Sequence, residues 1–414
     1  MNHIWSRIRR PGATRAGAWR SQVGVLTLAA LMVAGCSSTG STAGHARPGS
    51  SSTTTVAQLA AHGVEAPIGA VPWSQVGPGW LLATWSPARG LRHGQKPAPG
   101  EPTHEDSPTT LYLVDPVGGR YPITTFPPSP ARGLELVDWS GDGNRALFRD
   151  AAGLVEVDLH SGKQTAFTVP GADSGFNLNA HYTRPDGKAV LVSKPIGSPA
   201  SLERIDVAGK HQLTYPVGPG FRGQYLSTPD GTRLVLGTPS GLALMGNDGT
   251  PGEALPVPGK GVCSPVRWWD GAATTVLANC AGDGRPQLWL VPIGGGTPTA
   301  LTAAIVGTAT EDLGDVDAWQ LPAGTYVQSL GGCGFKYLSK LDAVGGPTTP
   351  VKVPGVQGSV FVIGANGGHL DLQAKAPCGG GQTLFDYDPV DNTTSVLLGP
   401  TVNGGGVIQA RAYP

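Results

Sequence analysis

Residues 182–195, YTRPDGKAVLVSKP, return at residues 226–239 as LSTPDGTRLVLGTP. In both copies a strand ends on Ser or Thr, Pro fixes one backbone φ, Gly supplies a residue free to adopt a positive φ, and a strand rich in Val and Leu follows. Each copy therefore predicts a β-hairpin. Less perfect copies of the turn occur at Asp142-Gly143, Asp270-Gly271, Ala323-Gly324 and Asn366-Gly367. Together with the two perfect copies they give six turns, spaced 44, 44, 40, 53 and 43 residues apart.

This period divides most of the chain into units of four short apolar runs. One such sheet cannot bury both of its faces unless neighbouring sheets stack on it, and a closed ring leaves no long open edge. We therefore predict an all-β fold, a β-propeller of about seven four-stranded blades. Two packed β-sandwiches are the alternative, but they do not need the same hairpin turn at a near-constant period. The predicted units are 70–126, 133–170, 176–216, 222–258, 261–302, 313–354 and 356–400.

The first and last strands leave one question open. In the first unit we assign strands to VPWSQV (71–76), WLLATW (80–85), TTLYLVD (109–115) and RYPITTF (120–126). The tail VIQARAY (407–413) has the pattern of one more inner strand without a blade behind it. It can pair with the first unit and close the ring, and the strand that it would displace there is left open.

The composition excludes some classes of function. The chain has 29 basic and 29 acidic residues in 414, so a basic surface for nucleic acid is not expected. The 63 glycines and 38 prolines recur between short apolar runs, which indicates many tight turns rather than disorder.

The N-terminus has the pattern of an export signal. Residues 1–22 carry five arginines and no acidic residue, and residues 23–34 form an uncharged apolar run. Twelve residues at about 1.5 Å each are too short for a hydrocarbon core about 30 Å thick, which disfavours a permanent transmembrane helix. Val33-Ala34-Gly35-Cys36 resembles the lipobox of bacterial lipoproteins, and this resemblance implies that Cys36 is diacylated and becomes the first mature residue. A chance cysteine in an ordinary exported protein is the alternative.

These features divide the chain into three parts. Residues 1–35 are predicted to be a lipoprotein signal peptide, and residues 36–69 the lipidated cysteine with a flexible tether rich in Ser, Thr and Gly. Residues 70–414 are predicted to be the propeller. We expect the protein at the extracytoplasmic face of the cell membrane, held there by its lipid.

The repeated Ser/Thr-x-Pro-Asp-Gly hairpins resemble the repeats of TolB-type propellers, which are related in architecture to WD-repeat propellers, over residues 70–414. The chain departs from the TolB pattern because it shows no room for the preceding α/β domain and carries its own lipid anchor. With its Ala, Gly, Pro and Arg content and few lysines, it is more similar to envelope lipoproteins of actinobacteria.

Four cysteines besides Cys36 are an even number in an oxidising compartment, which predicts disulfides. Cys263 precedes the Asp270 turn and Cys280 follows it, so that the two lie near each other in one hairpin. Cys333 and Cys378 both follow the second strand of adjacent units, on one face of the ring. We therefore predict the pairs Cys263–Cys280 and Cys333–Cys378. A metal site is the alternative, but no Cys-x-x-Cys motif or nearby His accompanies them.

The insertion at residues 86–108 contains residues able to bind a divalent metal, although its composition is also that of a solvated loop. We favour a loop that contributes to a binding rim and predict no metal site and no cofactor. The residues concerned are His93, His104, Glu105 and Asp106.

Polar residues on the predicted innermost strands would border the central channel. Asp138, His181, Tyr225 and Asp317 are the candidate ligand-binding residues, and Asn179, Arg267 and Asp315 accompany them. The alternative is that they bond neighbouring blades or channel water. The aspartates of the turns, Asp142, Asp186, Asp230 and Asp270, are expected to cap their own hairpins.

No catalytic motif accompanies this fold. The chain lacks the Gly-x-Ser-x-Gly elbow of propeller-bearing peptidases, and Ser140-Gly141-Asp142-Gly143 has the wrong spacing for a neuraminidase box. We therefore predict a binding or scaffold module for a protein or glycan partner in the envelope. The alternative is a cell-surface hydrolase or lyase that acts on carbohydrate through Asp138, His181 and Asp317.

Overall fold

The computed structural model describes residues 59–91, 94–128, 133–172, 174–194, 200–259, 261–281, 285–305, 312–376 and 381–414, without the side chain of Cys333. The residues described belong to one compact unit, Val56–Pro414.

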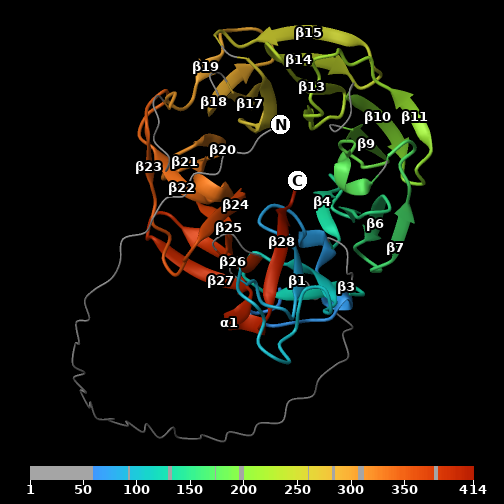
Figure 1. Ribbon diagram of the computed structural model, residues 1–414, viewed down its shortest axis with the longest axis vertical. Coiled ribbons are helices and arrows are strands. Elements are labelled where there is room, and N and C mark those ends of the chain that lie inside the picture. The colour runs from blue at the N-terminus through green and yellow to red at the C-terminus, as the bar shows by residue number, and fades with distance from the viewer. Residues whose placement is uncertain are drawn as a thin grey trace, which may run out of the picture. The chain divides into compact units, whose positions relative to one another are not determined.

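The compact unit is a seven-bladed β-propeller, as predicted. Seven four-stranded antiparallel sheets surround a central axis, with β4, β20, β24 and β28 among the strands nearest the centre (Figure 1). Blade 1 has the strand order β28-β1-β2-β3, formed by β28 (Gly406–Ala412), β1 (Leu81–Ser86), β2 (Thr109–Val114) and β3 (Arg120–Phe126). Blade 2 consists of β4 (Glu135–Trp139), β5 (Arg145–Arg149), β6 (Leu154–Asp158) and β7 (Gln164–Phe167).

The remaining blades follow the chain in order. Blade 3 consists of β8 (Asn179–Tyr182), β9 (Ala189–Lys194), β10 (Ser201–Asp206) and β11 (His211–Thr214). Blade 4 consists of β12 (Tyr225–Ser227), β13 (Arg233–Thr238), β14 (Gly241–Gly246) and β15 (Pro251–Pro256). Blade 5 consists of β16 (Cys263–Trp268), β17 (Thr275–Ala281), β18 (Pro286–Pro292) and β19 (Thr299–Ala300).

Blades 6 and 7 complete the ring. Blade 6 consists of β20 (Gly314–Leu321), β21 (Gly324–Leu330), β22 (Lys336–Leu341) and β23 (Thr348–Pro350). Blade 7 consists of β24 (Ser359–Asn366), β25 (His369–Lys375), β26 (Gly381–Asp388) and β27 (Thr393–Leu398), and the short helix α1 (Pro400–Asn403) leads from it to β28.

The first blade corrects one assignment made from the sequence. VPWSQV is not a strand, because its central residues Trp73–Gln75 form a single 3-10 turn. The tail strand β28 takes the innermost place instead and pairs antiparallel with β1, with Leu82 opposite Arg411. Strands from the two ends of the folded unit therefore close the ring within one blade.

Aspartates cap the hairpin turns, as predicted. Asp186 accepts a hydrogen bond from the Lys188 backbone N–H at 3.2 Å, and Asp230 accepts one from Thr232 at 3.0 Å. Asp142 and Asp270 do the same for Asn144 and Thr274. These bonds hold each turn in the shape that its Gly or Ala at positive φ requires.

The innermost strands differ in one respect. In blades 1, 2, 5, 6 and 7 the innermost strand contains one extra residue relative to its neighbour, a β-bulge, whereas β8 and β12 pair in unbroken register. The extra residues are Ile408, Val137, Val266, Val316 and Ile363.

A recurring position joins each blade to the next. The fifth residue of the second strand in blades 2 to 7 faces the following blade, and we call these the seam residues: Arg149, Ser193, Gly237, Asn279, Gln328 and Gln373. The Gln373 amide donates to Val407 O and Ile408 O, both at 3.0 Å, and so satisfies carbonyls at the bulge of β28. At Gly237 the backbones themselves approach, because a Cβ there would lie 2.6 Å from Cys263 O.

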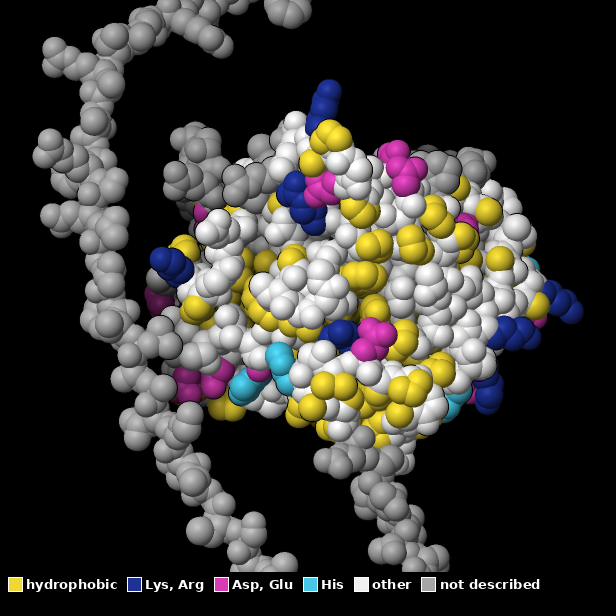
Figure 2. Space-filling model, turned by 90° about the horizontal axis from the view of Figure 1, so that it is seen from below, with side chains coloured by type: hydrophobic (Ala, Val, Ile, Leu, Met, Phe, Trp, Pro, Cys, Tyr) yellow, Lys and Arg dark blue, Asp and Glu magenta, His cyan; other side chains and the backbone are white. Residues whose placement is uncertain are grey.

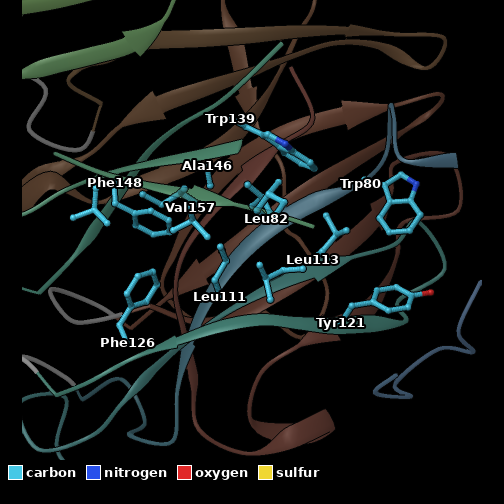
Figure 3. Close-up of a cluster of buried hydrophobic side chains, with 14 of the residues drawn as sticks. Trp80, Leu82, Leu111, Leu113, Tyr121, Phe126, Trp139, Ala146, Phe148 and Val157 are labelled. Carbon is cyan, nitrogen blue, oxygen red and sulfur yellow. The ribbon is translucent and has the colours of Figure 1, made fainter. Parts of the chain in front are cut away.

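Apolar side chains fill the spaces between blades. Figure 3 shows one such layer, in which Leu82, Leu111 and Phe126 of blade 1 face Phe148 and Val157 of blade 2. All of these side chains are buried, and each contributes about 1.5–3 kcal/mol relative to an exposed side chain. Stacking against a neighbour is thus what makes each sheet stable.

The segment before blade 1 also packs on the ring. The Ala60 N–H donates to Tyr121 Oη at 2.9 Å, and Glu65 pairs with Arg120 of β3 at 3.3 Å. The folded part therefore includes residues that precede position 70. Within the described residues, no helix has the length and apolar character needed to cross a membrane.

Candidate functional site

The ring encloses a central cavity of about 630 Å³. Each of the seven innermost strands, or the turn that follows it, contributes to the lining, which includes Asp138, Arg184, Ser227, Trp268, Trp319, Ile363 and Arg411. These positions lie near the carboxyl ends of the strands, and the C label in Figure 1 marks the chain end inside the ring. A residue from any blade can thus meet a ligand at one place.

Asp138 of β4 lies at the centre of a hydrogen-bonded cluster that joins blades 2 and 3. Its carboxylate accepts from the Tyr182 N–H at 2.8 Å and from Arg184 Nη2 at 3.2 Å, and His181 Nδ1 lies 3.7 Å away. Burial favours the protonated acid, but Arg184, His181 and the Tyr182 N–H outweigh burial and lower the pKa of Asp138 below its usual value. Asp138 is therefore ionised at neutral pH.

Asp317 of β20 belongs to a second cluster, between blades 5 and 6. Arg267 of β16 donates to its carboxylate through Nε at 2.7 Å and Nη2 at 2.5 Å, a bidentate ion pair. The same guanidinium lies 4.2 Å from the centre of the Trp319 ring. The Trp319 Nε1 is buried without a hydrogen-bond partner among the described residues.

His181 and Tyr225 line a smaller cavity of about 180 Å³ that shares Arg184, Leu226 and Ser227 with the central one. Their rings meet edge to face with centroids 5.6 Å apart. The Tyr225 hydroxyl donates to Leu191 O at 2.6 Å, and burial raises the pKa of this phenol well above its usual value. The structure thus brings Asp138, His181 and Tyr225 together, whereas Asp317 pairs separately with Arg267.

Two further polar residues of the predicted channel set have structural contacts. Asn179 donates through Nδ2 to Gly223 O at 3.0 Å. Asp315 is buried, accepts a bond from Ser329 Oγ at 2.8 Å, and has a pKa raised by burial. Its partner Ser329 lies on β21, so the Asp315 carboxylate bonds within blade 6. The bulge residue Val316 separates Asp315 from Asp317 along β20.

Sequence reasoning missed the arginine and the aromatic side chains that dominate the cavity wall. Arg411, Trp139, Trp268, Trp319 and Tyr413 all line it. Four of these five are aromatic residues at or near the carboxyl end of an innermost strand. That recurring aromatic position was the available signal.

The two candidate carboxylates belong to separate ion pairs. Asp138 and Asp317 each pair with a different arginine. Among the described residues, no three His, Cys, Asp or Glu side chains gather as metal ligands, and His93 lies outside these residues. In the insertion, Arg89 pairs with Glu101 and Thr103 Oγ1 donates to Asp106 at 2.6 Å, so the loop bonds to itself.

A disulfide of 2.02 Å joins Cys263 and Cys280, which are direct partners in the register of β16 and β17. This is the pair predicted from the hairpin. For the predicted pair Cys333–Cys378, Cys378 and the side chain of Cys333 lie outside the described residues, as does Cys36.

The surface carries both signs of charge without segregation on the face shown. In Figure 2 the Lys and Arg side chains lie among Asp and Glu, with neutral and hydrophobic side chains between them. This distribution agrees with the equal numbers of acidic and basic residues. It does not form the basic surface typical of nucleic-acid binding.

Comparisons with known proteins assign no family to the chain. No protein-family model matches the chain, and no curated protein matches it. A puromycin-hydrolysing peptidase of Mycobacterium tuberculosis is 16% identical over 72% of this chain and 50% of that one, with a TM-score of 0.45. An oligogalacturonate lyase of Vibrio parahaemolyticus is 12% identical over 64% and 78% of the two chains, with a TM-score of 0.42.

A TolB-like protein of Agrobacterium tumefaciens is also similar, at 13% identity over 71% of this chain and 94% of that one, with a TM-score of 0.37. The chain spans half the length of the peptidase. The class defined by fold and site is a seven-bladed β-propeller with a closed ring and a central cavity.

Proposed function

We propose that this protein is a lipid-anchored binding protein of the bacterial cell envelope, whose propeller binds a protein or glycan partner outside the cytoplasm. The lipobox-like stretch that ends at Cys36 supports the anchor. The cavity lined by all seven blades supports ligand binding, because its wall combines arginines with aromatic side chains.

One observation favours binding over catalysis, namely that arginines neutralise both candidate carboxylates. A glycosidase needs one carboxyl group that keeps its proton near neutral pH and a second that is ionised. Asp138 has a lowered pKa, and both oxygens of Asp317 accept bonds from Arg267. The carbohydrate-active alternative would therefore need an acid other than Asp138.

Crosslinking in cells followed by co-purification tests the binding function. The full-length protein is expected to enrich one partner, and a variant with Arg184→Ala and Arg267→Ala at the cavity is expected to lose it. A variant with Lys163→Ala on the outer face should retain the partner, since Lys163 is exposed and does not line the cavity. Recovery of the full-length protein alone would contradict the proposal.

Metabolic labelling with a fatty-acid analogue tests the anchor separately. Wild-type protein should take up the label and fractionate with membranes, and Cys36→Ala should lose both properties while its propeller remains folded. Equal labelling of the two proteins would show that Cys36 is not the acylated residue.

A further inference from the structure

Arg411 is the arginine of the cavity wall whose guanidinium makes no hydrogen bond or ion pair with a residue that the structure describes. It lies on β28 and is partly exposed. Burial lowers the pKa of its guanidinium, whereas the nearby charge of Asp138 raises it. The other two arginines of the wall each hold a carboxylate, Arg184 with Asp138 and Arg267 with Asp317. Two of the three guanidinium groups of the wall are thus engaged by side-chain carboxylates, and the guanidinium of Arg411 is left to meet a ligand.

We propose that this cavity binds an acidic sugar and that Arg411 pairs with the carboxylate of that sugar. This inference rests on the proposed binding function and specifies its ligand. A guanidinium group presents two parallel N–H donors that match the two oxygens of a carboxylate. The position of Arg411 in a concave site strengthens its pairing with a carboxylate, because the surrounding protein reduces the screening of the two charges by water.

The rest of the wall suits the body of a sugar. Trp268 and Tyr413 are half-buried and offer aromatic surface to the cavity, which Trp139 and Trp319, largely buried, also line. Aromatic rings pack against the C–H faces of a pyranose as they do against other apolar groups. The cavity volume of about 630 Å³ falls in the range typical of small-molecule sites.

Donors for sugar hydroxyls remain available around the hollow. Arg267 uses Nε and Nη2 for Asp317, and its Nη1 has no partner among the described residues. Arg184 uses Nη1 for Trp139 O and Nη2 for Asp138, which leaves its Nε. These donors come from separate blades and surround a hollow. That arrangement fits a compact polyhydroxylated ring better than an extended peptide, which needs a strand edge or a long groove.

Titration calorimetry with glucuronic acid as the probe tests the inference on the folded protein. Wild type should bind glucuronic acid, bind neutral glucose at least about tenfold more weakly, and lose affinity as salt rises. Arg411→Gln should weaken glucuronic acid binding about tenfold or more, since a charged hydrogen-bond pair is lost, and should leave glucose binding unchanged. Arg411→Lys should fall between the two, because it keeps the charge without the paired donors.

Arg222→Gln is the matched control. Arg222 is an exposed arginine in the loop before β12 and does not line the cavity, so its removal should leave binding unchanged. Thermal unfolding and near-UV circular dichroism of each variant verify that it is folded. Equal binding of glucuronic acid and glucose, or equal affinity of wild type and Arg411→Gln, would overturn the proposal.

A third probe separates the sugar from its carboxylate. If N-acetyl-alanyl-alanine binds through Arg411 and glucuronic acid does not, the ligand is a peptide carboxylate and the sugar assignment is wrong. Crosslinking and co-purification with the Arg411→Gln variant in cells distinguishes the proposed partner binding from the proposed binding of an acidic sugar. A retained partner with no glucuronic acid binding in wild type would overturn this inference and leave the binding function standing.

Discussion

Blades 3 and 4 differ from blades 6 and 7 in how they reach the same four-stranded sheet. Their innermost strands have four and three residues in unbroken register, whereas β20 and β24 have eight residues each and contain a bulge. The seam residues change in parallel: they are Ser193 and Gly237 in blades 3 and 4, and Gln328 and Gln373 in blades 6 and 7.

This difference indicates two ways of joining neighbouring blades. At Gly237 the backbone of the following blade approaches, at Cys263 O, so the seam residue there must be small. A bulged strand leaves carbonyls without a partner in their own sheet, and an amide side chain from the previous blade then satisfies them. The Gln328 amide satisfies both a carbonyl and an N–H of β24, since it donates to Val360 O at 2.9 Å and accepts from the Val362 N–H at 2.8 Å.

Exposed turn aspartates of blades 3 and 4 and buried strand aspartates of blades 6 and 7 have pKa values shifted in opposite directions. At the turns of blades 3 and 4, the pKa values of Asp186 and Asp230 are lowered, chiefly by hydrogen bonds from Lys188 and Thr228. In blades 6 and 7, burial raises the pKa of Asp315, and it raises that of Asp371 to about 7. Acid should therefore lower the stability contributed by the turns of blades 3 and 4, and neutral pH should lower that contributed by the buried aspartates of blades 6 and 7.

The largest expected effect concerns Asp371. Burial raises its pKa first, Asp386 on the adjacent strand raises it further, and His369 opposes them. Because the folded-state pKa of about 7 exceeds an unfolded value of about 4, the stability contributed by the protonated acid is lost as pH rises through this window, up to about 4 kcal/mol. Asp371→Asn should flatten the dependence of urea unfolding on pH between 4 and 7. An unchanged slope would show that Asp371 is ionised in the folded protein.

Gly231→Ala should cost about 3 kcal/mol of unfolding free energy. The residue has φ of +70°, and an added Cβ would lie 1.7 Å from Arg184 O of the neighbouring turn. Gly367→Ala, in the corresponding turn of blade 7, is the matched control. It has φ of +59° with no atom within 4 Å, so only the backbone cost of about 1 kcal/mol remains. Equal losses in urea unfolding would mean that the two turns are packed alike.

Gln373→Leu should destabilise the ring by about 2 kcal/mol, because Val407 O and Ile408 O become buried acceptors without donors. Gln164→Leu removes an exposed bond between blades, from Nε2 to Thr124 Oγ1, and should change stability by less than about 0.5 kcal/mol. Urea unfolding followed by tryptophan fluorescence gives both values. If the two variants lose the same amount, the seam amides do not support the bulges.

Asp230→Asn should have the smallest effect, about 0.5 kcal/mol at pH 7, because the exposed cap loses only its charge. The lowered pKa of Asp230 means that its contribution is present above pH 4 and lost as pH falls through the folded-state pKa. The difference between wild type and variant should therefore shrink in acid, as unfolding is measured at successively lower pH below 4. A difference that persists there would assign the effect to something other than the carboxylate.

Local chemistry explains what could be predicted from the sequence. Pro-Asp-Gly turns at a regular period predicted the blades, and the hairpin around Asp270 predicted the disulfide of Cys263 and Cys280. The tail 407–413 was correctly predicted as a strand that can close the ring. The strand that it displaces could not be predicted, because 71–76 is equally strand-like and only long-range pairing with β1 decides between the two. The pairing of Asp138 and Asp317 with arginines was hidden for the same reason.

The seam residues were within reach of the sequence. Arg149, Ser193 and Gly237 recur at intervals of 44 residues, the period of the perfect turns. They were overlooked because they share a position and not a chemical type. The repeat is defined by backbone geometry, so the residue type can vary at the position where a side chain meets a carbonyl of the next blade.

The cavity wall is complete only after β28 has paired with β1 and closed the ring. A chain synthesised from its N-terminus can form blades 2 to 7 in order, while β1 waits with an open edge for a partner 325 residues away. That closing step has a high contact order and a large loop-closure entropy, so it should be slow. Because Arg411 and Ala412 belong to β28, a chain whose ring has not closed has no finished cavity wall. Ligand binding at this cavity therefore reports that the ring has closed.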